Sequence, residues 1–453
     1  MKNIMKIKSH IACLWIGCFF LFNSSFAQEK LTLSEAIEFA LENKAEAKKA
    51  KLEIINSEHV IEETRSAALP QVNFDGALNY NPLIQKSAIP AEIFGGEPGE
   101  FMMVEFGQKW QGQGAVAVSQ QLFNQTVFTG LKAAKTTREF YQINNTLTEE
   151  ELIEKVANSY YEVYQAQLRL ETLENNLENT NKTKKIIEGM YESGLAKKID
   201  LDRVKVSVSN LEAQKQQLVN ALELQENALK FVIGMNISTK IEMPEETFEI
   251  QYKDYGGVDG FNSRTEVKML DKQQELLELN RQAIVSEYYP SLMLTGNFGY
   301  LGFGNTFPLF FKDKGVQWSN FGGVGLSLSI PIFNGNATRA RVRQADVELK
   351  MNEIDKEDAL LALSMADENA KAQIRNSLLT VQSNRENVVL AKEVMEDTQN
   401  NYRLGIATLT EMLEAETAYA DAQNNLNTSL LDYKVAEIQV LKSKGELKSL
   451  LIN

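Results

Sequence analysis

The residue types that most often carry catalysis are few in this chain and are badly placed for it. Both cysteines, Cys13 and Cys18, fall close to the N-terminus, and His59 is the one histidine well inside the chain. No nucleophile stands beside a base, no His and Asp cluster has metal-ligand spacing, and no glycine-rich loop suits a phosphate. The sequence therefore predicts that the protein is not an enzyme and uses neither a metal nor a cofactor.

The N-terminal segment has the order of a secretory signal peptide. Lysines at its start precede an apolar run over 11–22, and a small-residue cleavage pattern ends at Ala27. The run is shorter than the roughly 20 apolar residues of a membrane-spanning helix, so we expect residues 1–27 to be cleaved. The alternatives are a short N-terminal anchor and a lipid attached to Cys18, which Gly17 precedes.

The chain is acidic along most of its length. Its formal net charge is −14, and loss of the three lysines in the expected signal peptide would bring it to −17. Nucleic-acid binding needs an excess of Lys and Arg against the phosphates, so the sequence excludes nucleic acid as a partner. We expect most of the acidic side chains to form a solvated surface.

The sequence repeats itself after slightly more than two hundred residues. Three landmarks return in the same order: 69–70 as 289–290, 122–124 as 332–334, and 191–196 as 402–407. A repeat of this length is too long for a solenoid unit. It indicates two duplicated structural halves, residues 28–245 and residues 246–453.

Each half is expected to run helix, strand, loop, strand, long helix, turn, helix. The first helix begins at Thr32, and Glu35 completes a capping-box pattern. Nothing breaks a helix over 125–193 or 335–404, which at 1.5 Å per residue gives about 100 Å each. The shorter helices over 35–68 and 199–233 could therefore lie end to end beside the first long one.

The long helix over 125–193 carries a seam with the 3.5-residue period of a left-handed coiled coil. Its members step alternately by four and three: Leu152, Val156, Ser159, Val163, Ala166, Leu170, Leu173, Leu177, Thr180, Lys184 and Ile187. The small and polar members suit a wide, partly wet assembly. An ordinary coiled-coil scaffold is the alternative from the helices alone.

Four segments alternate between apolar and polar residues, as strands with one apolar face do. They cover about 71–80, 113–123, 291–301 and 321–333. The side chains expected to face lipid are Val72, Phe74, Leu292, Leu294, Leu326, Leu328 and Ile330. Strands of this length cross a bilayer when tilted, although a single such strand could also cover a soluble core.

Spanning strands need a closed barrel, because lipid cannot satisfy the hydrogen bonds of an open sheet edge. Four strands are too few, since the smallest such barrels have about eight. The chain must therefore associate, and the physical argument allows two or three copies. The segments 81–112 and 302–317 are expected to be loops at the outer face.

At this point the sequence resembles the TolC family of outer-membrane efflux proteins. The resemblance rests on the opening segment 31–36, the helix–proline–strand junctions at Pro70 and Pro290, and two Tyr-x-x-Gly-x-Ala turns. It implies a mixed membrane α+β fold and a homotrimer. Each copy would give four strands to a shared twelve-strand transmembrane β-barrel and its helices to a long periplasmic α-helical barrel. Residues near 234–261 and the C-terminus would form an equatorial belt.

The resemblance also implies the function. The protein would be the exit duct of a tripartite efflux or secretion system in the bacterial outer membrane, joined to an inner-membrane pump by a periplasmic adaptor. It would conduct substrates passively. The alternatives are a passive trimeric porin without a pump, and a periplasmic coiled-coil structural protein without a barrel.

The family's gate residues can be carried over position by position. Tyr402 matches the gate tyrosine, and Asp200 matches the aspartate that it bonds on a neighbouring chain. Glu411 and Glu414 match two acidic positions at the entrance, where aspartates are familiar. Ala407 stands where the family has a gate arginine, so part of that network is missing.

The same two turns are expected to dock the adaptor. Gly194 and Gly405 allow the backbone to turn tightly between helices. Leu195, Leu404 and Ile406 would then be left exposed as apolar contacts at the periplasmic tip.

Overall fold

The computed structural model describes residues 30–244, 250, 260–308 and 315–451, so the expected signal peptide lies outside the described residues. The chain forms two compact units. The first, which we call the helical unit, combines Met1–Lys49, Leu147–Phe261 and Ala362–Asn453. The second, the sheet unit, combines Ala50–Thr146 and Asn262–Leu361. Each unit therefore takes segments from both sequence repeats.

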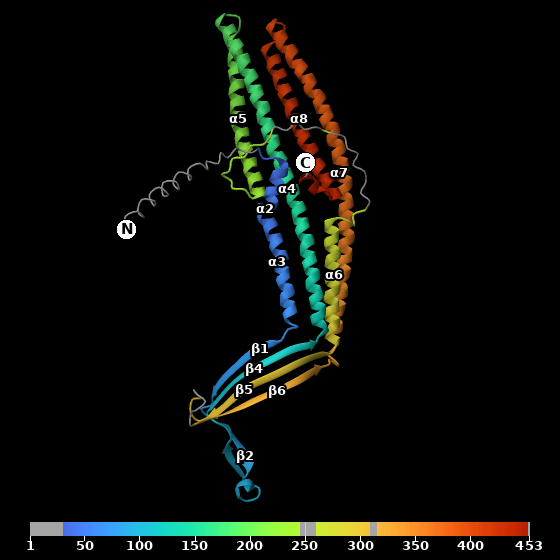
Figure 1. Ribbon diagram of the computed structural model, residues 1–453. Coiled ribbons are helices and arrows are strands. Elements are labelled where there is room, and N and C mark those ends of the chain that lie inside the picture. The colour runs from blue at the N-terminus through green and yellow to red at the C-terminus, as the bar shows by residue number, and fades with distance from the viewer. Residues whose placement is uncertain (1–29, 245–249, 251–259, 309–314, 452–453) are drawn as a thin grey trace, which may run out of the picture. The chain divides into compact units, whose positions relative to one another are not determined.

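The sheet unit contains the four expected strands. They are β1 (Gln71–Tyr80), β4 (Trp110–Phe123), β5 (Ser291–Gly304) and β6 (Val316–Ser329). They pair antiparallel in the order β1-β4-β5-β6, so the two halves of the duplication meet at β4 and β5 (Figure 1). β1 and β6 are the outer strands of this sheet.

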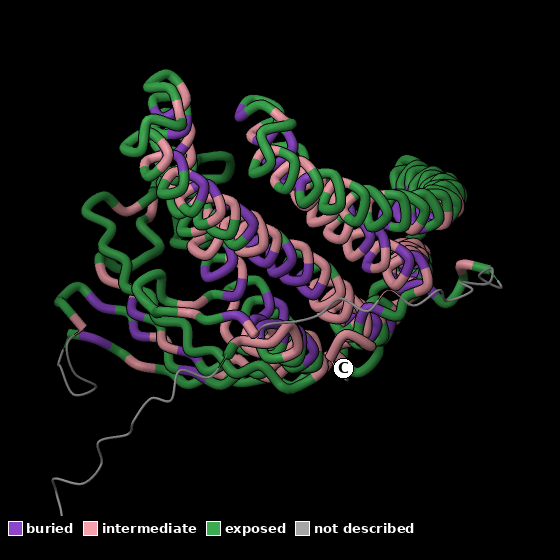
Figure 2. The backbone as a smooth tube through the Cα atoms, turned by 90° about the horizontal axis from the view of Figure 1, so that it is seen from above, coloured by how far each residue is buried: buried purple, intermediate pink, exposed green. Residues whose placement is uncertain are grey.

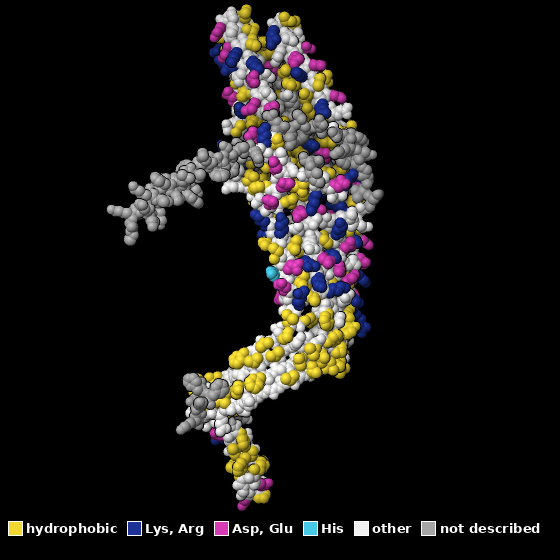
Figure 3. Space-filling model, in the orientation of Figure 1, with side chains coloured by type: hydrophobic (Ala, Val, Ile, Leu, Met, Phe, Trp, Pro, Cys, Tyr) yellow, Lys and Arg dark blue, Asp and Glu magenta, His cyan; other side chains and the backbone are white. Residues whose placement is uncertain are grey.

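The register gathers the apolar side chains on one face of the sheet. Phe74, Val116 and Phe298 are directly paired across three strands, and directly paired residues share a face. The members of this face are Val72, Phe74, Leu78, Tyr80, Val116, Val118, Leu292, Leu294, Phe298, Val324, Leu326 and Leu328. Most of them are exposed, and Figure 3 shows hydrophobic side chains gathered over the sheet. The opposite face holds mainly Asn, Gln, Ser, Gly and Ala.

The last strand ends earlier than the alternation predicts. β6 stops at Ser329, which pairs with Ser291 at the start of β5. Pro290 and Pro331 flank this pair, and proline has no N–H to give to a ladder. Ile330, expected to face lipid, is therefore exposed but lies outside the strand.

The segment expected to be a plain loop, 81–112, contains a second hairpin. β2 (Lys86–Pro90) pairs with β3 (Phe101–Glu105), and the short helix η1 (Ala91–Phe94) begins the connection between them. Its strands are only five residues long. The segment also holds three prolines and several glycines, which are typical of loops, so the sequence did not predict these strands.

Four helices stand side by side in the sheet unit, and ion pairs mark their order. They are α3 (Ala45–Ser66), the first part of α4 (Gln125–Glu192), α6 (Thr265–Val285) and the first part of α7 (Ala337–Arg403). The pairs are Arg138–Glu58 between α3 and α4, Lys272–Glu139 between α4 and α6, and Arg281–Asp346 between α6 and α7. Exposed pairs like these add only about 0–1 kcal/mol each. After α6 the short helix η2 (Ser286–Tyr288) leads to Pro290 and β5.

The helix expected over 35–68 is two helices. α2 (Leu33–Asn43) begins with the capping box of Thr32 and Glu35, as expected, and ends before Lys44, whose backbone is extended. The Lys44 ammonium donates to the carbonyl oxygen of Phe231 at 2.8 Å and lies 3.9 Å from the Phe231 ring. Contacts with the end of α5 (Lys198–Ile233) thus stabilise the break between α2 and α3. The local sequence around Lys44 does not predict this break.

The helical unit holds two helix hairpins. α4 and α5 form the first, and α7 and α8 (Leu409–Lys444) form the second. α8 packs on α4, where Lys442 pairs with Glu154 at 2.8 Å and Arg169 donates to Thr428 at 3.1 Å. The coiled-coil seam of α4 is buried or half-buried at each of its positions, and buried residues follow the helices as stripes in Figure 2.

The main apolar core of the helical unit joins α2, α4, α5 and α8. Its largest fully buried side chains include Ile37, Ile153, Tyr160, Leu229 and Ile438. The C-terminal helix η3 (Leu447–Leu451) packs on this core. The described part of the expected belt runs from Gly234 to Pro244 and carries no strand, and most of its remainder lies outside the described residues.

No helix in the described ranges is both long enough and apolar enough to cross a membrane.

Candidate functional site: the two interhelical turns

The turns that connect α4 to α5 and α7 to α8 have the same backbone. In the first, the amides of 194, 195 and 196 donate to the carbonyls of 191, 190 and 190. In the second, the amides of 405, 406 and 407 donate to the carbonyls of 402, 401 and 401. Gly194 and Gly405 have φ of +77° and +75°, a conformation that strongly favours glycine. The turns are therefore equivalent positions of the duplication, 211 residues apart.

Each turn presents apolar side chains to the outside. Leu195 is 75% exposed, Leu404 is 74% exposed and Ile406 is 73% exposed. Inside the turns, a small core of Ile187, Leu201, Val204, Leu409 and Met412 joins the two hairpins. The exposed side chains of Leu195, Leu404 and Ile406 thus lie on turns that a buried core holds together.

The two turns start their second helices differently. Thr408 caps α8 and shares a capping box with Glu411, whose carboxylate accepts from the Thr408 amide at 2.7 Å. These bonds from the backbone and the hydroxyl of Thr408 lower the pKa of Glu411. Lys197 begins α5 without a side-chain cap. Asp200, the equivalent of Glu411, is therefore not used as a cap.

Asp200 and Tyr402 of the same chain lie near each other. Tyr402 is half-buried against the core that joins the hairpins. Burial raises the pKa of the Tyr402 phenol, and the charge of Asp200 raises it further. Within one chain, Asp200 therefore acts on Tyr402 through its charge, and the bond between neighbouring chains that the family resemblance implies stays a prediction.

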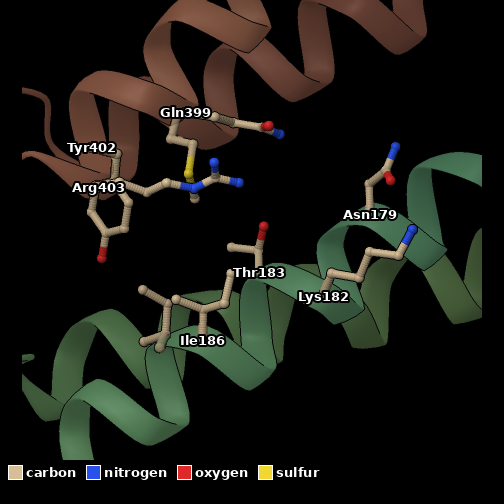
Figure 4. A pocket seen from close by; sticks show the side chains of 9 residues that line it. Asn179, Lys182, Thr183, Ile186, Gln399, Tyr402 and Arg403 are labelled. Atoms are coloured by element: carbon tan, nitrogen blue, oxygen red, sulfur yellow. The ribbon is translucent and has the colours of Figure 1, made fainter.

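A cavity of about 110 Å³ lies beside Tyr402, between α4 and α7. Figure 4 shows Gln399, Tyr402 and Arg403 of α7 facing Asn179, Lys182 and Thr183 of α4. Polar side chains from both hairpins therefore line one cavity, which Tyr402 at the end of α7 also lines.

An arginine that the sequence reasoning missed links the two hairpins. Arg203 of α5 donates to the Thr410 hydroxyl of α8 at 3.0 Å. Both residues line an open hollow of about 470 Å³ that Glu414 also lines. The family resemblance implied only that the gate arginine is missing at Ala407, and with it part of the latch network. The sequence did hold one indication of Arg203, because it is the repeat equivalent of Glu414, which was expected at the entrance.

Other candidate residues have ordinary surroundings. His59 lies 3.2 Å from Glu62 on α3, and both side chains are exposed. Within the described ranges, no cluster of His, Cys, Asp and Glu could hold a metal ion.

Comparison with known sequences agrees with this architecture. The sequence profile of outer membrane efflux proteins matches residues 36–235 and 262–446. Outer membrane protein TolC of Vibrio cholerae is 23% identical over 397 residues, which are 85% of this chain and 84% of that protein. The probable efflux pump outer membrane protein TtgC of Pseudomonas putida is 21% identical over 300 residues, 65% of this chain and 60% of that protein.

Solved structures share the fold. The outer membrane protein VceC from Vibrio cholerae superposes with a TM-score of 0.70 at 17% identity, covering 91% of this chain and 96% of VceC. The CmeC outer membrane channel of Campylobacter jejuni gives 0.72 at 16% identity, covering 93% and 90%. The arrangement of long helices with a small sheet is therefore that of these channels.

Proposed function

The chain belongs to the outer membrane efflux protein family, and from this premise we propose that three copies assemble into one exit duct of a tripartite system. The duct lies in the outer membrane and extends into the periplasm. Each copy contributes β1, β4, β5 and β6 to a shared barrel in the membrane and its long helices to a helical barrel below. A periplasmic adaptor connects this duct to an inner-membrane pump.

The observation that carries the proposal is the four-stranded sheet. It has one exposed apolar face, a polar opposite face and two outer strands, β1 and β6. An apolar face suits lipid and a polar face suits a water-filled lumen, but the outer strands still need hydrogen-bond partners in the membrane. Joining β6 of one copy to β1 of the next satisfies both edges and closes the barrel.

The helices support association as well. α7 carries exposed apolar side chains spaced by three, four or seven residues: Val347, Met351, Ile354, Leu361 and Met365. This is the spacing of a coiled-coil seam without a partner. Leu52 and Ile55 of α3 are also exposed. A neighbouring copy would cover such stripes, and a soluble rod or an isolated chain would leave them in water.

The turn region supports a gated entrance rather than an open pore. The charge of Asp200 on α5 raises the pKa of the Tyr402 phenol on α7, and Arg203 of α5 donates to Thr410 of α8. Because both interactions lie within one chain, we place the latch inside each copy. Each latch holds the α7–α8 hairpin against the α4–α5 hairpin, and opening requires that the hairpins part.

Glu414 is the better candidate for an acidic ring at this entrance. The Glu411 carboxylate already accepts hydrogen bonds from the amide and hydroxyl of Thr408 at the start of α8. It is therefore less free to bind a cation. Glu414 is exposed and lines the hollow beside Arg203. Three copies would bring three such carboxylates together, and acidic rings attract cations.

The barrel predicts a sharp difference between neighbouring positions on β6. Val324 lies mid-strand on the apolar face and Gly325 lies on the opposite face. Val324→Arg places a charge in lipid at a cost of roughly 2–4 kcal/mol per copy, so trimers should fail to assemble in the outer membrane. Gly325→Arg should assemble and change the conductance. Equal assembly of both variants, measured by heat-modifiable migration of membrane fractions, would contradict the barrel.

The docking surface predicts loss of export without loss of the channel. Leu195→Glu with Leu404→Glu removes two exposed apolar contacts, so the adaptor should no longer co-purify and export should fall at least tenfold. Ser193→Glu, which adds a charge at the repeat equivalent of Leu404 but removes no apolar contact, is the matched control. Unchanged co-purification in the double variant would refute docking here, and a channel that never captures an adaptor would be a passive porin.

The acidic ring predicts a change in ion selectivity. Glu414→Gln should lower the cation preference of single channels and weaken block by polyvalent cations, because three charges leave the entrance. Glu414→Asp keeps the charge and should retain both properties. The reversal potential in a salt gradient measures the selectivity, and a wild-type value in Glu414→Gln would remove the ring from the proposal.

The latch predicts a higher resting conductance when either partner is changed. Tyr402→Phe keeps the ring packing and deletes only the hydroxyl, and a phenol–carboxylate bond shielded from water is worth about 1.5–3 kcal/mol. Asp200→Asn should act in the same direction, and the double variant should be less than additive because both changes break one interaction. Planar-bilayer recordings measure the effect. Closed channels with wild-type conductance in both single variants would show that another contact holds the entrance.

A further inference from the structure

Glu416 is a buried acid between the two helix hairpins. It lies on α8, it is 3% exposed, and α4 and α7 pack around it. Within the described ranges, no lysine or arginine forms an ion pair with it. A buried carboxylate without a cation is costly unless neutral donors or a proton compensate it.

The hydrogen bonds of Glu416 fit a protonated carboxyl. Its Oε1 accepts from the Thr183 hydroxyl at 3.1 Å and from the Gln399 amide at 3.2 Å. Its Oε2 lies 3.5 Å from the Thr180 hydroxyl, which itself lies 3.0 Å from the carbonyl oxygen of Asn176. A hydroxyl has one proton. The proton of Thr180 has the shorter contact to Asn176, so Oε2 of Glu416 receives at most a weak donor contact from Thr180. A proton on the carboxyl would remove the cost of a buried charge that has so few close donors.

The duplication shows that this acid replaces an ordinary ion pair. The repeat equivalents of Gln399 and Glu416 are Glu188 and Lys205. In the first hairpin, Lys205 and Glu188 form a partly exposed pair between α4 and α5 at 3.9 Å. In the second hairpin the cation has become Glu416 and the anion has become Gln399. The contact within the hairpin remains, and the new carboxyl also bonds Thr183 of the other hairpin.

The charged groups around Glu416 do not neutralise it. Glu178 and Lys182 of α4 line the same polar cavity of about 280 Å³, but they pair with each other at 2.7 Å. Tyr419 of α8 also lines this cavity, and Tyr402 and Arg403 of α7 line the adjacent one. Burial raises the pKa of Glu416, against the lowering effect of Thr183, Gln399 and Thr180.

We propose that Glu416 positions the two hairpins of each chain against each other, and that the protonated form of this link holds the periplasmic entrance closed. The proposal rests on the proposed function of the two turns as a gate. In the closed state the Glu416 carboxyl bridges Thr183 of α4 and Gln399 of α7. When the hairpins part, the carboxyl meets water and titrates as an ordinary glutamate.

The direction of the pH dependence follows from linkage. A carboxyl whose pKa is raised in the closed state binds its proton more tightly there than in the open state. Its stabilisation of the closed state is therefore complete below the ordinary glutamate pKa of 4.5 and is lost as pH rises through the raised value. Acidification should therefore close the channel. For each unit by which burial raises the pKa of Glu416, the ratio of closed to open channels should rise by up to tenfold.

Planar-bilayer recordings of the full-length trimer between pH 7.5 and pH 4.5 test this inference. The open probability of the wild type should fall on acidification. Glu416→Gln imitates the protonated carboxyl, since its amide can donate to Thr180, and should be mostly closed at every pH. Glu178→Gln with Lys182→Gln removes both partners of the nearby ion pair and should keep the wild-type response. A pH response that survives in Glu416→Gln would overturn the proposal.

A second measurement separates this link from the gate itself. Difference infrared spectra of the detergent-solubilised protein over the same range, pH 7.5 to pH 4.5, should show a protonated carboxylic acid band that Glu416→Gln lacks. Thr183→Val removes a donor from α4 and should weaken the acid closure without removing the band. If the wild type forms no channels, the gate fails and the band still tests Glu416. Channels without the band would refute the titration of Glu416.

Discussion

A strand in hydrocarbon must have hydrogen-bond partners along both of its edges, and this constraint governs the whole chain. The four strands of one copy leave β1 and β6 with open edges. In a soluble protein, a helix from the same chain could cover such a sheet. Here the apolar face that the strands share is needed for contact with lipid, so a helix cannot cover it. In the proposed trimer, neighbouring copies supply the hydrogen-bond partners of both edges. They would also cover the exposed apolar stripes of α7 and α3.

The strands and long helices could be predicted because each is determined by a local pattern. Alternation located all four strands of the large sheet, and the register confirms that their apolar residues share one face. The exceptions depend on contacts distant in sequence. Ile330 falls outside β6 because the partner strand begins only at Ser291, and the helix break at Lys44 is held by Phe231. Neither partner is visible in the local sequence.

The two turns could be predicted from the repeat, but their contacts could not. Equivalent glycines identified both turns, and their backbones agree bond for bond. Arg203 and Glu416 could not be predicted from the motifs that the two halves share. The informative positions are those where the halves differ: Arg203 is the equivalent of Glu414, and Lys205 is the equivalent of Glu416.

These differences have a physical reason in a ring built from alternating hairpins. If the two halves had stayed alike, each hairpin would meet neighbours with the same charge at the same height, and like charges repel. In this chain residue 203 on α5 is an arginine, whereas its repeat equivalent on α8 is the exposed Glu414. In the proposed ring, each hairpin would then have an unlike neighbour on both sides, one from its own chain and one from the next copy. The duplication would supply the hairpins of the ring, and the divergence of the two halves would remove the repulsion between neighbours.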